Sequence, residues 1–104
     1  MDTMLRALAD GTRRRILALV WRDERTAGEI AAEFAMTRPA VSQHLAVLRD
    51  SKLVSVRPDG TRRLYRANRQ SMARLRAELG AFWDDRLAQL RDVAEAAERK
   101  GRRR

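Results

Sequence analysis

Apolar residues recur along this chain at the spacing of amphipathic helices, and the pattern predicts five helices. Four short helices are expected at residues 3–9, 12–22, 27–34 and 38–51. A last, long helix is expected to follow Asn68 and to continue to about Glu98. Its length and its apolar positions distinguish it from the four short helices that precede it.

Residues that cap helix N-termini stand one or two positions before four of these segments. Asp10 precedes the second helix, Thr37 the fourth and Asn68 the fifth. Thr26 precedes the third helix and is followed three residues later by Glu29, which is the pattern of a capping box. Pro39 lies in the first turn of the fourth helix, where its missing N–H is not needed.

Two short β segments are predicted between the fourth and fifth helices. Leu53–Val56 and Thr61–Ala67 are rich in β-forming residues, and Pro58-Asp59-Gly60 between them is a turn signal. The chain is therefore predicted to be mainly α with a small β-hairpin, in the order α-α-α-α-β-β-α. Two short helices at a tight turn, at Ala35-Met36, followed by a hairpin, form a winged helix-turn-helix.

Composition restricts the function. The 104 residues fit one domain, expected over 1–98, with a basic, disordered tail at 99–104. Cysteine is absent and His44 is the single histidine, so thiol chemistry and histidine-based catalytic pairs are excluded. We expect no enzyme, no cofactor and no metal site. Without an apolar segment of membrane-spanning length or a signal peptide, we expect a cytoplasmic protein with no membrane partner.

The net charge of +9 is distributed unevenly along the chain. Residues 37–68 carry 7 basic and 2 acidic side chains, a net charge of +5. Residues 69–98 mix both signs, as a solvated helix face does. A basic segment with little acid is the better candidate for contact with DNA phosphates.

The fourth helix has one apolar face and one polar face. Val41, Leu45 and Leu48 form a buried stripe. The residues predicted to face DNA are Arg38, Pro39, Ser42, Gln43, His44 and Arg49. Arginine suits guanine, glutamine suits adenine and serine bonds either a base or a phosphate. His44, at the edge of the two faces, is expected to pack and to bond the backbone or a phosphate.

The hairpin adds a second basic element. Arg57, Arg62 and Arg63 are predicted to contact the DNA backbone or minor groove, because they flank the turn. Alternation along a strand places Arg62 and Arg66 on one face, with Leu64, and Arg63 on the other, with Tyr65. A charged edge that prevents aggregation is the alternative reading.

Three segments resemble the arsenic-repressor (ArsR-type) winged-helix family of bacterial transcription regulators. They run from Leu8 to Leu17, from Thr37 to Leu48 and from Leu53 to Tyr65. The resemblance implies a homodimeric repressor that binds double-stranded DNA at a palindromic operator. It also implies pairing through the first and last helices, with the residues Met4, Leu5, Leu8, Leu79, Phe82, Trp83, Leu87 and Leu90.

The sequence departs from the metal-sensing relatives of this family. It has neither their Cys-x-Cys motif nor a histidine on the last helix, and carboxylates alone bind soft metals weakly. We therefore expect a branch without metal sensing, whose inducer the residues do not identify. Phe82-Trp83 is assigned to dimer packing, with the wall of a ligand pocket as the alternative, and Trp21 to the core or an interface.

Two other functions remain open. A basic winged-helix module can bind RNA or a protein partner, and a small-molecule-responsive activator would use the same fold. The first alternative predicts no palindromic preference in a selection from random duplexes.

Overall fold

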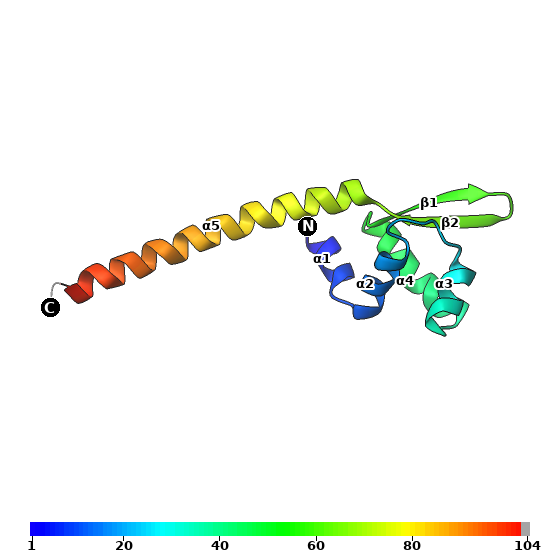
Figure 1. Ribbon diagram of the computed structural model, residues 1–104, viewed down its shortest axis with the longest axis horizontal. Coiled ribbons are helices and arrows are strands. Elements are labelled where there is room, and N and C mark those ends of the chain that lie inside the picture. The colour runs from blue at the N-terminus through cyan, green and yellow to red at the C-terminus, as the bar shows by residue number, and fades with distance from the viewer. Residues whose placement is uncertain (103–104) are drawn as a thin grey trace. The chain divides into compact units, whose positions relative to one another are not determined.

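A computed structural model describes residues 1–102 of the chain (Figure 1). Its elements are α1 (Asp2–Leu8), α2 (Gly11–Leu19), α3 (Ala27–Phe34), α4 (Arg38–Asp50), β1 (Val54–Asp59), β2 (Arg62–Ala67) and α5 (Arg69–Arg102). This is the predicted order. The chain divides into two compact units, the first comprising residues 1–73 and the second starting at Arg74 within α5. No helix in residues 1–102 is both long and apolar enough to cross a bilayer.

All four predicted N-caps are present. The side chains of Asp10, Thr37 and Asn68 accept hydrogen bonds from backbone N–H groups three residues later, at 3.0, 3.3 and 3.1 Å. Thr26 and Glu29 make both bonds of the capping box, each at 3.1 Å. These caps satisfy N–H groups that have no partner within a helix, and so define where each helix begins.

Helices α3 and α4 end in the same way, at a left-handed residue other than glycine. Ala35 after α3 has φ = 52°, and Lys52 after α4 has φ = 64°. The N–H of Met36 donates to the Ala31 carbonyl at 3.0 Å, and that of Leu53 to the Leu48 carbonyl at 2.8 Å. These are Schellman motifs, and they turn the chain sharply at both places. The first is the tight turn predicted between the two helices.

The hairpin turn lies one residue later than predicted. Strand β1 continues through Pro58 to Asp59, which pairs with Arg62, so the connection is Gly60-Thr61. Gly60 has φ = 62°, as the first central residue of a type II′ turn requires. Pro58 is compatible with a strand here because β1 pairs on one side only, with β2, and proline is tolerated on an edge strand.

Helix α2 ends at Leu19, three residues before the predicted end at Arg22. The chain leaves the helix because the Val20 carbonyl accepts a hydrogen bond from the Ala67 N–H at 2.9 Å. Further on, Arg25 and Tyr65 exchange backbone hydrogen bonds of 2.8 and 3.1 Å, an isolated bridge on the free side of β2. The segment between α2 and α3 therefore supports the hairpin from one side.

One apolar core holds the first unit together. Its buried members come from helices α1 to α4, from both strands and from the segments that join them: Ala7, Ile16, Leu17, Val20, Ile30, Ala31, Val41, Leu45, Leu48, Leu53, Val54 and Ala67. The predicted stripe of α4 is confirmed, with Val41, Leu45 and Leu48 all buried.

The part of α5 in the second unit has no comparable core. Phe82, Trp83 and Leu90 expose 40%, 56% and 64% of their surface. The helix also continues past Glu98 to Arg102, so residues 99–102 of the predicted disordered tail are helical. Arginine and lysine are good helix formers and extend the last turns. Residues 103–104 of that predicted tail lie outside the described residues.

Candidate nucleic-acid interface

Helix α4 presents a short, mostly exposed polar face. Arg38, Pro39, Ser42, Gln43 and Arg49 are exposed, whereas His44 is half-buried at the edge of that face. This arrangement follows from the helical period, because the three core residues of α4 occupy the opposite side. The side chains predicted to read DNA therefore lie together on the accessible face of one helix.

Helix α3 packs beside α4 and shapes the entry to this face (Figure 1). The guanidinium of Arg38 lies across the start of α3, over Gly28. A Cβ built on Gly28 would be 3.2 Å from Arg38 Nη1 and 3.6 Å from Arg38 Cζ. The absence of a side chain at Gly28 lets Arg38 lie close to the α3 backbone. The sequence alone gave no indication of this contact, since the two residues belong to different helices.

A groove of about 410 Å³ joins α3, α4 and the hairpin. Arg38 and Ser42 line it from α4, and Arg62, Arg63 and Tyr65 line it from the hairpin. Arginine guanidinium groups bind phosphate oxygens through paired N–H donors. The fold thus brings two of the predicted α4 residues and two of the predicted hairpin residues to one concave surface.

The arginines of the hairpin have different partners. Arg62 Nη2 donates to Asp59 Oδ2 across the turn at 2.8 Å. Arg57 Nε donates to Glu24 Oε2 at 2.7 Å, and this hydrogen bond raises the pKa of the Arg57 guanidinium. Arg63 is exposed and has no ion-pair partner among the residues that the structure describes. Arg57 therefore also ties the hairpin to the segment before α3.

The strand register sorts the hairpin side chains as predicted. Arg57 pairs with Leu64 and Asp59 with Arg62, whereas Pro58 pairs with Arg63. Directly paired residues point to the same face of a hairpin, and successive residues along a strand point to opposite faces. Arg57 and Arg62 consequently share one face and Arg63 lies on the other.

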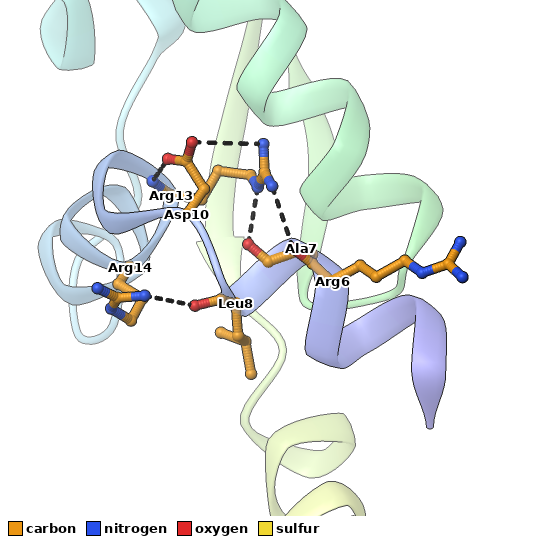
Figure 2. Close-up of polar contacts among 6 residues, drawn as sticks. All are labelled: Arg6, Ala7, Leu8, Asp10, Arg13 and Arg14. Atoms are coloured by element: carbon orange, nitrogen blue, oxygen red, sulfur yellow. Dashed lines mark hydrogen bonds and ion pairs between the residues drawn. The ribbon is translucent and has the colours of Figure 1, made fainter.

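Two arginines in the first helical turn of α2 serve the fold rather than this groove (Figure 2). Arg13 Nε donates to the Ala7 carbonyl at 2.7 Å, and Arg14 Nη1 to the Leu8 carbonyl at 2.7 Å. They satisfy carbonyls at the end of α1, where no further helical N–H is available. Counting charges along the sequence did not separate these structural arginines from those of the groove.

Asp10 completes this junction between α1 and α2 (Figure 2). Its carboxylate accepts the Arg13 backbone N–H at 3.0 Å and lies 4.0 Å from Arg13 Nη1. The backbone hydrogen bond from Arg13 is the main cause that lowers the pKa of Asp10, with smaller contributions from the charges of Arg13 and His44.

Residues 1–102 contain no cluster of potential metal ligands. No group of three or more histidine, cysteine, aspartate or glutamate side chains is placed to hold a metal ion within that range.

This fold and its basic groove define a class of protein, the winged helix-turn-helix DNA-binding transcription regulators. Residues 10–56 match the family model for bacterial regulatory proteins of the arsR family. The HTH-type transcriptional regulator Rv2034 of Mycobacterium tuberculosis is 46% identical over 82 residues, which are 79% of this chain and 77% of that protein. The chain belongs to the arsR family of bacterial regulatory proteins. Because the members of this family are DNA-binding regulators and not enzymes, the prediction that the chain is not an enzyme is confirmed.

Two further relatives describe the family more closely. The transcriptional repressor SdpR of Bacillus subtilis is 38% identical over 55 residues, which are 53% of this chain and 61% of that protein. The homodimeric winged helix-turn-helix DNA-binding domain of Mb0332 from Mycobacterium bovis, a possible ArsR-family regulator, has been solved in solution. It superposes with a TM-score of 0.66 and 35% identity, covering 80% of this chain and 77% of that domain.

Proposed function

We propose that this regulator is a cytoplasmic homodimer that represses transcription by binding a palindromic operator. The groove between α4 and the hairpin carries the proposal, because it gathers arginines from two separate elements on one accessible surface. The transcriptional repressor SdpR among its relatives supports repression. We propose that this chain represses by occluding a promoter. A two-fold dimer would place its two α4 helices in successive major grooves, about 34 Å apart.

Base reading is assigned to the first turns of α4. Arg38, Ser42 and Gln43 would contact base edges, with Pro39 keeping the approach close. His44 and Arg49 would contact or support contacts to phosphates. Arg57, Arg62 and Arg63 would bind the flanking DNA backbone, with Arg57 also held by Glu24.

Dimerisation is assigned to apolar residues of α1 and α5. The residues proposed are Met4, Leu5, Leu8, Leu79, Phe82, Trp83, Leu87 and Leu90. Those of α5 from Phe82 onward are exposed in the described chain, and burying them removes apolar surface from water. The homodimeric Mb0332 domain supports a homodimeric state, and the choice of these residues rests on their apolar character and exposure.

Operator binding is proposed to need no metal. The chain has no cysteine and one histidine, which leaves carboxylates as the other candidate ligands. Affinity measured after exhaustive chelation, and again with added Zn²⁺, should therefore be unchanged. A change of fivefold or more in either condition would contradict this part of the proposal.

The decisive experiment combines selection and substitution. Selection from random duplex DNA should return a palindrome, and binding to it should be measured by fluorescence anisotropy. Arg38→Ala and Gln43→Ala should each lose about 1–3 kcal/mol and relax preference at one position. Arg62→Ala should weaken binding to all sequences alike and reduce the salt dependence.

Arg91→Ala, in the second unit, is the matched control and should bind as the wild type does. Selection that returns no motif would favour the alternative of a module for RNA or a protein partner. Groove variants that bind the operator normally would refute the assigned face.

A further inference from the structure

An apolar cavity opens in the first unit, away from the DNA groove. It has a volume of about 600 Å³, which is within the range of about 300–1,000 Å³ typical of sites for small organic molecules. Its apolar walls come from α1, from α2 and the turn that follows it, and from the first turn of α5: Leu8, Leu17, Leu19, Trp21 and Met72. Leu19, Trp21 and Met72 are half-buried, so these side chains leave apolar surface open to an occupant, whereas Leu8, at the edge of the cavity, is also assigned to the dimer interface.

The rim of the cavity carries more positive than negative charge. Arg14, Arg22 and Asp23 complete the lining. Arg14 is held by the Leu8 carbonyl at 2.7 Å. The exposed side chain of Arg22 makes no hydrogen bond or ion pair within the described part of the chain. Its guanidinium fork is therefore available to an anionic group, and carboxylates match that fork geometrically.

The wall of the cavity is continuous with the segment that supports the hairpin. Trp21, Arg22 and Asp23 line the cavity, and the residues on either side of them bind the hairpin. Before them, the Val20 carbonyl accepts the Ala67 N–H at 2.9 Å. After them, Glu24 pairs with Arg57 at 2.7 Å, and Arg25 forms the bridge with Tyr65.

We propose that this cavity binds a small apolar carboxylate, and that its occupancy weakens DNA binding by shifting the segment that holds the hairpin. The apolar walls take the hydrocarbon part, and Arg22 takes the carboxylate. Insertion beside Trp21 displaces the backbone between Val20 and Arg25, and the hairpin arginines move with it. The regulatory half of this inference rests on the proposed DNA-binding function, whereas ligand binding does not.

Ligand binding can be observed directly because the chain has two tryptophans. In a Trp83→Phe variant, Trp21 is the remaining tryptophan and its fluorescence reports on the cavity. Decanoate is the probe, and 1-decanol is its uncharged analogue of equal chain length. We expect a saturable change in Trp21 emission with both, and tighter binding of decanoate.

Two substitutions in the same background separate charge from shape. Arg22→Met retains an apolar stem and should weaken decanoate about fivefold, as loss of an exposed ion pair does, without changing 1-decanol. Ala18→Phe fills the cavity from an exposed position of α2 and should abolish binding of both probes. Arg6→Met, an exposed arginine outside the cavity, is the matched control and should bind both normally.

The regulatory half is tested with operator DNA. Saturating decanoate should lower the affinity of the wild type about tenfold, within the usual range of allosteric coupling, and should leave Ala18→Phe unaffected. A non-saturable Trp21 response, or one equal in Ala18→Phe, would overturn the site. Trp21 emission that changes on dilution of the protein but not with decanoate would show that a second copy occupies the cavity, which also overturns it.

Saturable binding without any change in DNA affinity would overturn the coupling alone. Loss of DNA binding in every variant and condition would refute the proposed function. The fluorescence titration would still show whether the cavity binds decanoate.

Discussion

The two units of this chain bury their apolar residues to very different extents. In the first unit the large apolar side chains of α2, α3 and α4 meet in one core, in which Ile16, Ile30 and Leu48 are fully buried. In the second unit, Phe82, Trp83 and Leu90 of α5 stay largely exposed. The core of the first unit holds the proposed DNA-binding face in shape. The second unit presents apolar surface that needs a partner, which is why dimerisation is assigned to it.

The largest expected effect comes from the core of the first unit. Leu48→Ala removes a fully buried side chain of α4 and should lower the free energy of unfolding by about 3 kcal/mol. Urea denaturation followed by circular dichroism measures the change. Val47→Ala, at the neighbouring exposed position, is the control and should cost under about 0.5 kcal/mol. Equal losses at the two positions would contradict the described core.

The second prediction concerns the exposed stripe of α5. Leu90→Glu should leave the first unit folded but raise the dissociation constant of the dimer. A buried leucine contributes about 1.5–3 kcal/mol, so we expect at least about a tenfold increase. Analytical ultracentrifugation measures the constant. Ala81→Glu, about a quarter-turn away from Phe82, is the control. A Leu90→Glu protein that dimerises as the wild type does would remove α5 from the interface.

A smaller effect should raise the stability of the first unit without changing the dimer. Ala35 has a left-handed backbone conformation, with φ = 52°. This conformation is unfavourable for a residue with a Cβ atom and is not unfavourable for glycine. Ala35→Gly should therefore add about 0.5–1 kcal/mol to the free energy of unfolding. Thermal melts measure it, and Ala32→Gly within α3 should instead lose about 1 kcal/mol. If both variants were destabilised alike, the turn geometry would be wrong.

The smallest effect is a pH dependence in the first unit. Hydrogen bonds from the backbone N–H groups of Arg13 and Thr26 lower the pKa values of Asp10 and Glu29 below those of free carboxyl side chains. Their stabilisation is complete above the unfolded-state pKa values and is lost as the pH falls through the folded-state values. The melting temperature should therefore fall below about pH 4. Asp10→Asn with Glu29→Gln should flatten that fall, and an unchanged slope would argue against these caps.

Local patterns predicted the elements better than their ends. The four N-caps and the Val41–Leu45–Leu48 stripe depend on residues within one helical turn or two, so the sequence was sufficient for them. The end of α2 and the position of the hairpin turn were wrong. The first depends on a hydrogen bond between Val20 and Ala67, which are distant along the chain.

The sequence predicted which residues belong to the candidate site, but it did not predict which other residues they contact. Arg38, Ser42, Arg62 and Arg63 were chosen from the sequence and meet at one groove. The contact of Arg38 with Gly28 and the pairing of Arg57 with Glu24 were not foreseen. No pattern in a single sequence links such pairs, because only folding brings them together.

The sequence by itself determined the order of the elements, their caps and the family of the protein, because these depend on the spacing of nearby residues and on short motifs. The tertiary structure decided what each arginine does. Arg13 and Arg14 cap α1, Arg57 holds the hairpin through Glu24, and Arg38 and Arg63 line the open groove. These side chains are chemically identical, and their roles differ because packing gives each one different neighbours.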